Sequence, residues 1–193
     1  MRDTEPARLL PDADRLPTLD TPRLRLRWLT PDDAPALFAI FGDPAVCRYW
    51  SRPPLTDVPD AHALLAEIAA SFAERSLFQW GIAERDGGRL VGTCTLASLS
   101  PEHARAEVGF ALARACWGRG YVAEALPAMV RFAFETLGLH RLEADADPRN
   151  AASIRALERV GFVREGHQRE RYWMSDEWQD AILFGLLRRD WRD

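Results

Sequence analysis

The chain has 193 residues, 47% of them hydrophobic, and its 25 basic residues, all arginine, stand against 29 acidic ones, for a net charge of −4. This length suits one globular domain, and a mildly acidic chain without a basic cluster is a poor candidate for nucleic-acid binding. The three separated cysteines have no metal-ligand spacing, so we expect neither a disulfide framework nor a metal site.

Residues 1–17 lack the apolar stretch of a signal peptide, and no apolar run is long enough to cross a bilayer. We therefore expect a cytoplasmic protein with no membrane contact. Residues 1–18 are rich in Pro, Asp and Arg, which predicts a flexible arm before a single domain of residues 19–193.

Alternating apolar and charged residues predict a half-buried strand at 23–29. Thr30, followed by a proline and two acids, marks the start of a helix that ends at a Gly-Asp-Pro sequence, and residues 57–75 form a second helix. Asp86-Gly87 is a hairpin signal between two strand-like runs, and a further strand covers 106–112.

A period of 3.6 predicts a helix from about 121 to 137, although Pro127 lies inside it. A strand at 140–147 precedes a short helix that Asn150 caps and Gly161 ends, with Leu157 and Phe162 closing a Schellman motif. Two more strand-like runs complete the chain. This order predicts a mixed α/β (α+β) fold with a largely antiparallel sheet of about seven strands and about four helices.

The segment RACWGRGYVAEAL, residues 114–126, places two glycines where a helix begins. Gly118 and Gly120 permit positive φ, so that successive N–H groups can converge on an anion at the positive end of the helix dipole, with Arg114 and Arg119 adding charge. The spacing alone fits a simple turn equally well. It matches neither a nucleoside-triphosphate loop nor a dinucleotide fingerprint.

The strand at 106–112 carries Glu107, Gly109 and Ala111 on one face. Two small residues beside a carboxylate leave room for a ligand against the sheet, and the carboxylate can accept a proton. The alternative is a structural salt bridge from Glu107 to an arginine on a neighbouring strand.

Taken together, these segments resemble the GNAT N-acetyltransferases, in particular the branch of the ribosomal-protein N-terminal acetyltransferases RimJ and RimL. The resemblance runs from about Leu19 to the end of the chain. It rests on the order of LDTPRLRLRWLTPDDAPALFAIFGDPAV, GRLVGTCTL, AEVGFAL, WGRGYVAEAL, DPRNAASIRALERVGF and RYWMSDEWQDAILFGLL.

The resemblance implies a GNAT-type fold that uses acetyl-coenzyme A as acetyl donor, without a metal. By the same likeness, the backbone of one strand pairs with the pantetheine arm, a glycine loop holds the diphosphate, and an Asn-x-x-Ser sequence contacts the pantetheine and the thioester. The corresponding residues are Phe110, Ala111 and Leu112 in the strand, Trp117, Gly118, Arg119, Gly120, Tyr121 and Val122 in the loop, and Asn150 and Ser153.

Amide formation requires a neutral amine, and Glu107 is our candidate for the general base. Many relatives protonate the leaving thiolate with a tyrosine, but Leu157 occupies that position here. Ser153 is therefore the first candidate for the acid, and Tyr172 and Glu170 are the second. No histidine neighbours Cys116 in sequence, so direct transfer is favoured over an acetyl-cysteine intermediate.

Three functions fit these features. The acceptor is a protein N-terminal α-amino group, or it is a small amine such as a polyamine or aminoglycoside, or the chain binds coenzyme A without catalysis. Relatives are monomers or homodimers, and the sequence does not choose between these states. Trp50, Trp80, Trp173 and Trp178 are expected mostly in the core, with Trp50 also bordering the acceptor groove.

Overall fold

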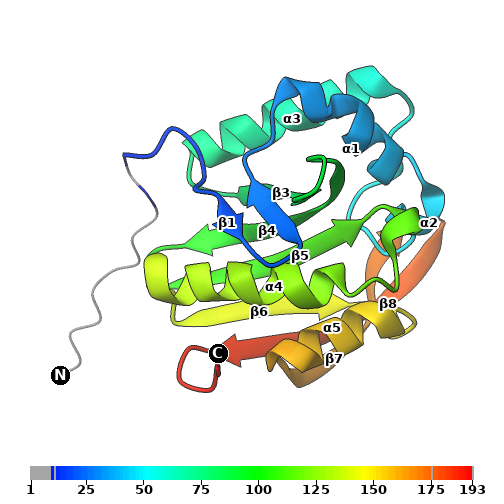
Figure 1. Cartoon of the computed structure of the whole chain (residues 1–193). Helices are drawn as coiled ribbons and strands as arrows, with labels where there is room; N and C mark the ends of the chain where they lie inside the picture. The colour runs from blue at the N-terminus through cyan, green and yellow to red at the C-terminus, as the bar shows by residue number, and fades with distance from the viewer. Residues whose placement is uncertain (1–9, 11, 175, 193) are drawn as a thin grey trace.

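The computed structural model describes residues 10, 12–174 and 176–192, which form one eight-stranded sheet flanked by helices (Figure 1). The strands are β1 (Leu19–Asp20), β2 (Leu24–Arg27), β3 (Phe78–Glu84), β4 (Leu90–Ser100), β5 (Arg105–Leu112), β6 (Arg141–Ala146), β7 (Val163–Met174) and β8 (Glu177–Leu187). The helices are α1 (Ala34–Phe41), α2 (Pro44–Cys47), α3 (Val58–Ala73), α4 (Tyr121–Arg131) and α5 (Ala151–Val160). None of the helices in these residues is both long and apolar enough for a membrane span.

The strand order is β1-β2-β3-β4-β5-β6-β8-β7, and every neighbouring pair is antiparallel except β5 and β6. The predicted mixed and largely antiparallel fold is thus confirmed. The sheet gains one strand over the prediction, because Leu19 and Asp20 pair with β2. A fifth helix, α2, forms where the sequence predicted only a stop, because Asp43 caps it by accepting from the N–H of Ala45 (2.8 Å).

Two hydrophobic clusters cover the sheet. One joins α1 and α3 to Leu90 and Ala111, and the larger one packs α4 and α5 against the central strands. Helix α4 continues through Pro127 and ends in a π-helical turn at Phe132–Thr136. The Schellman motif after α5 is present, with the Phe162 N–H donating to the Leu157 carbonyl (3.1 Å).

The parallel pairing of β5 with β6 determines where the site forms. Strands β5 and β6 are in register from Arg105↔Arg141 to Glu107↔Glu143, and they separate beyond that point. Residues Val108 to Leu112 therefore keep β4 as a neighbour on one side and have no strand on the other. This gap in the sheet leaves backbone groups available to a ligand.

The expectation that most tryptophans lie in the core is wrong for two of them. Trp80 is fully buried, but Trp173 and Trp178 are more than half exposed. They are paired near the tip of the β7–β8 hairpin, in which β7 is the edge strand of the sheet (Figure 1). The two rings pack on each other, edge to face, with centroids 5.3 Å apart.

Part of the predicted arm, residues 1–9 and 11, lies outside the described residues. Within the remainder, Leu16 is buried in the larger cluster, and the Pro17 carbonyl accepts a hydrogen bond from Trp80 Nε1 (2.9 Å). These two residues are therefore held against the core.

Candidate active site

A cavity of about 600 Å³ opens where β5 and β6 separate. Its wall brings together residues that were predicted from three separate segments of the sequence. The predicted residues that line it are Glu107, Phe110, Ala111, Leu112, Trp117, Gly118, Gly120, Tyr121, Val122, Asn150 and Ser153. Arg119, Glu170 and Tyr172 were also predicted, but their side chains do not line it.

The glycine loop at the start of α4 has the conformation of an anion site. Gly118 and Gly120 adopt φ of 75° and 77°, and Gly120 is the N-cap of the helix. A Cβ placed on Gly118 would meet nothing within 4 Å, so open space lies beside the backbone. The first N–H groups of α4 have no intrahelical acceptors and carry the positive end of its dipole. The loop therefore fits a diphosphate.

Arg23, the residue just before β2, supports this loop through hydrogen bonds. The sequence alone predicted no role for it. Its Nη1 donates to the Arg119 carbonyl (3.0 Å), while its Nε donates to Glu124 in the first turn of α4 (2.7 Å). Glu124 also accepts from the Thr21 hydroxyl (2.6 Å). These bonds compensate the Glu124 charge, which would otherwise oppose an anion at the helix start.

Glu107 is the last residue of β5 that pairs with β6, and it lies next to the gap in the sheet. Its side chain is accessible from the cavity, yet the surrounding protein replaces much of its water. This burial raises the pKa of the Glu107 carboxyl, and the negative charge of Asp145 raises it further, against a smaller opposing effect of Arg171. Glu107 forms no ion pair with any other described residue, so the structural salt bridge considered as the alternative is absent there.

Tyr172 does not line the cavity itself, but it hydrogen-bonds a residue that does. Its hydroxyl donates to Asp145 Oδ2 (2.5 Å), and Asp145 lines the cavity. Burial and the hydrogen bond to Asp145 raise the pKa of Tyr172 to about 12. The sequence analysis missed Asp145, although the alternation of β6 places it on the opposite face from Leu142 and Ala144.

Asn150 caps α5 by accepting from the Ser153 N–H (3.2 Å), which orients both residues toward the cavity wall. Leu157 also lines the cavity, so no phenol occupies that position. Cys116 is buried and does not line the cavity. Its location agrees with the preference for direct transfer.

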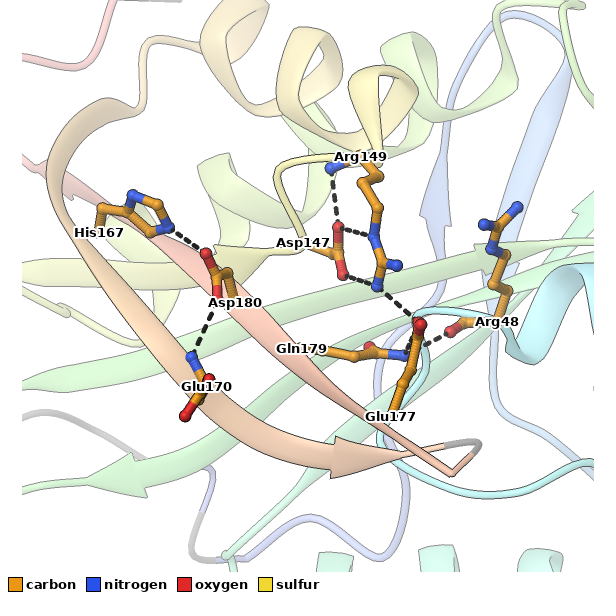
Figure 2. Close-up of polar contacts among 8 residues, drawn as sticks. All are labelled: Arg48, Asp147, Arg149, His167, Glu170, Glu177, Gln179 and Asp180. Carbon is orange, nitrogen blue, oxygen red and sulfur yellow. Dashed lines mark hydrogen bonds and ion pairs between the residues drawn. The ribbon is translucent and has the colours of Figure 1, made fainter.

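The β7–β8 hairpin is tied to the cavity by a polar network (Figure 2). Arg149 Nη2 bonds Asp147 (2.7 Å) and Glu177 (2.8 Å), and Gln179 Nε2 donates to the Arg48 carbonyl (3.4 Å). Farther along the hairpin, Asp180 accepts hydrogen bonds from His167 Nε2 (2.8 Å) and from the Glu170 backbone N–H (2.9 Å).

Residues 23–163 match the family model of the acetyltransferase (GNAT) domain, which covers the loop, β5 and α5. The chain belongs to the GNAT family. The GNAT domain, together with relatives named as N-acetyltransferases, supports an acyltransferase that depends on acetyl-coenzyme A. An uncharacterized N-acetyltransferase, p20 of Bacillus licheniformis, is 33% identical over 90% of this acetyltransferase and 98% of its own length.

More distant relatives differ in the acceptor that they name. The [ribosomal protein uS5]-alanine N-acetyltransferase of Escherichia coli is 28% identical over 67% of each chain. A spermidine N-acetyltransferase from Vibrio cholerae, solved in complex with CoA and spermine, superposes with a TM-score of 0.78 over 87% of this chain and 97% of its own. At 20% identity, this second likeness shows the fold alone.

Proposed function

We propose that this acetyltransferase transfers an acetyl group to the α-amino group of a protein or peptide N-terminus, as in the RimJ and RimL branch. The observation that carries the proposal is the charge balance of the cavity. Of its three lining carboxylates, Glu67 is paired with Arg52 (2.6 Å), and Asp145 is held by Tyr172 and Arg171. Only Glu107 has no ion pair, and its raised pKa disfavours a permanently ionised carboxylate.

A cavity in which one carboxylate lacks an ion pair fits an acceptor with one amine. A polyamine carries further ammonium groups, and each of them would need a carboxylate that is free of other partners. An N-terminal residue brings a single amine followed by neutral peptide groups. The uS5-alanine relative supports this class of acceptor.

The donor is expected on the other side of the gap. The N–H groups from Gly118 to Val122 would hold the diphosphate of acetyl-coenzyme A, and the unpaired edge of Phe110, Ala111 and Leu112 would pair with its pantetheine arm. The Asn150 carboxamide keeps its NH₂ group for a ligand, because its oxygen caps α5. The donor supplies an acyl thioester, which an amine can attack directly.

In this proposal Glu107 takes a proton from the acceptor ammonium, directly or through a water, and the neutral amine then attacks the acyl carbonyl. A backbone N–H of β5 beyond Glu107 is placed to stabilise the oxyanion. The Ser153 hydroxyl, at the cavity wall, donates to the departing thiolate. Tyr172 stays protonated at neutral pH and holds Asp145 in place.

The acceptor class is tested by thiol release from acetyl-coenzyme A with short peptides, the same peptides blocked at the N-terminus, spermidine and an aminoglycoside. We expect release with the free peptides only, with one acetyl group on the α-amine by mass spectrometry. Turnover with spermidine or the aminoglycoside alone would contradict the proposal. Release with none of the amines, despite coenzyme A binding, would indicate a non-catalytic module.

The role of Glu107 is tested by the variant Glu107→Gln. We expect kcat to fall by about 100-fold or more, because the amide cannot accept the proton. The rate of the wild-type enzyme should decline as pH falls through the raised pKa of Glu107, and the variant should lose this limb, with its optimum moved to higher pH. The Kd for coenzyme A should not change. A pH–rate profile identical to that of the wild type would exclude Glu107 as the base.

A further inference from the structure

A row of three residues crosses the sheet at the inner end of the acceptor side of the cavity. Gln79 on β3 is the register partner of Thr95 on β4, which in turn is opposite Gly109 on β5. All three line the cavity. Gly109 lacks a side chain, and a Cβ placed there would only touch Thr95 and the Trp50 ring at 3.9 Å. The row is therefore accessible to a ligand at this point.

Both polar side chains in the row are buried. Gln79 and Thr95 are each only 6% exposed. The Thr95 hydroxyl is fully buried and has no hydrogen bond to a described residue. The Gln79 carboxamide is not among the fully buried groups without a partner, because it borders the cavity. Buried polar groups are almost always paired, because an unpaired one costs the free energy of its lost hydration. The Thr95 hydroxyl, with Gln79 beside it at the cavity wall, is therefore available to a ligand that satisfies it.

The surroundings define the chemistry of that ligand. The cavity around the row has apolar lining residues, among them Trp50, Leu64 and Ile68. The Trp50 ring packs at a tilt against Phe41. A charged group there would lose its hydration, and of the lining carboxylates Glu67 is paired with Arg52 and Glu107 is assigned to the acceptor amine. A purely apolar group would leave both polar side chains unsatisfied. An uncharged hydrogen-bonding group meets both conditions.

We infer that Gln79 and Thr95 are specificity-determining residues, which select acceptors carrying an uncharged hydrogen-bonding group such as a hydroxyl or carboxamide. This inference rests on the proposed function and assigns the group to the side chain at the acceptor N-terminus. Gln79 offers a donor and an acceptor, and the Thr95 hydroxyl offers both. Sites built in this way discriminate strongly against an analogue that lacks the polar group, because their own groups then stay unpaired.

Thr93 provides a matched control within the same strand. It is fully buried, and its hydroxyl is also without a partner. It does not line the cavity, unlike Thr95 two residues away. Thr93→Val therefore makes the same chemical change as Thr95→Val, but at a position outside the proposed contact.

The experiment compares peptides that differ only in a first residue of matched shape, Thr against Val and Asn against Leu. For the wild type, we expect kcat/KM to favour the polar member of at least one pair by about tenfold or more. The ratio should fall below about threefold in Thr95→Val and Gln79→Met, and it should not change in Thr93→Val. Neither cavity variant should lower the thermal midpoint, because each replaces an unpaired buried polar group with an apolar one of similar shape.

Equal use of both members of each pair by the wild type would overturn this inference and leave the proposed function intact. An unchanged ratio in both cavity variants would do the same, as would an equal loss of activity toward polar and apolar peptides. No turnover with any peptide would contradict the proposed function itself, and this inference with it. If Gln79→Met does not fold, the ratio measured for Thr95→Val decides alone.

Discussion

At the scale of single residues, the site is defined by polar groups that the fold leaves uncompensated. Glu107 is the clearest case, because its pKa is raised by burial and by Asp145. The buried carboxylates, by contrast, are fully paired. Asp33, for example, accepts from both Nη atoms of Arg27, and these bonds lower its pKa despite its burial. An unpaired carboxylate lowers the stability of the folded state, and its proposed use in catalysis explains why it is present.

Because the ionised Glu107 carboxylate lowers the stability of the folded state, Glu107→Gln is expected to raise that stability where Glu107 is ionised. A carboxyl whose pKa is higher in the folded state than in the unfolded state stabilises the protein below its unfolded pKa, and this contribution is lost as pH rises through the folded pKa. The variant should therefore melt about 1–3 °C above the wild type at pH 8. The two should melt together near the unfolded pKa or below it, at about pH 4. Scanning calorimetry across this range measures the effect, and a lower midpoint for the variant at pH 8 would contradict it.

At the scale of elements, the start of α4 is shaped by β2 as well as by its own glycines. Gly118 and Gly120 allow the turn, but Arg23 holds it through the Arg119 carbonyl. The same arginine neutralises Glu124, which lies in the first turn of the helix. The proposed diphosphate site thus depends on two elements about 100 positions apart, as the separation of 101 between Arg23 and Glu124 shows.

Removing this brace should weaken donor binding. We expect Arg23→Ala to raise the Kd for coenzyme A about tenfold, which corresponds to about 1.4 kcal/mol, because the loop loses its support and Glu124 its counterion. Arg25→Ala is the control, since Arg25 is two residues away and pairs with Asp20 (2.8 Å) instead of with the loop. Isothermal titration calorimetry measures both variants. An equal Kd for the two would show that Arg23 does not support the loop.

At the scale of the whole molecule, the β7–β8 hairpin connects the end of the chain to the cavity. Arg149 bonds Glu177 at the hairpin and Asp147 before α5 (Figure 2). Its guanidinium also lies 5.6 Å from the centre of the Tyr49 ring. Tyr49 itself lines the cavity. The hairpin, the start of α5 and the segment after α2 are therefore held together on the acceptor side.

Arg149→Ala should release this connection. We expect KM for an acceptor peptide to rise about fivefold with a smaller change in kcat, because the mutation loosens Tyr49 and the hairpin rather than the reacting groups. Amide hydrogen exchange in residues 177–181 should become faster. Arg164→Ala serves as the control, because it breaks an ion pair with Glu158 (2.8 Å) at the far end of the same hairpin. The same rise in KM for both variants would contradict a specific role of Arg149.

Much of this architecture follows from local patterns. Alternation of residue types predicts the strands, since successive side chains of a strand point to opposite faces. Asn150 and Gly161 mark both ends of α5 because a cap and a left-handed turn need particular residue types. Trp173 and Trp178 escaped prediction because large aromatic residues are usually buried, whereas these lie exposed near the tip of the β7–β8 hairpin.

The sequence by itself thus determined the helices and strands other than β1 and α2, the glycine loop before α4 and the carboxylate on β5, because each depends on residues within a few positions of one another. The tertiary structure alone decided the separation of β5 from β6, the approach of Asp145 to Tyr172, the brace from Arg23, and the row of Gln79, Thr95 and Gly109. These features depend on strand register and on contacts between distant segments, which a linear pattern of residues does not contain.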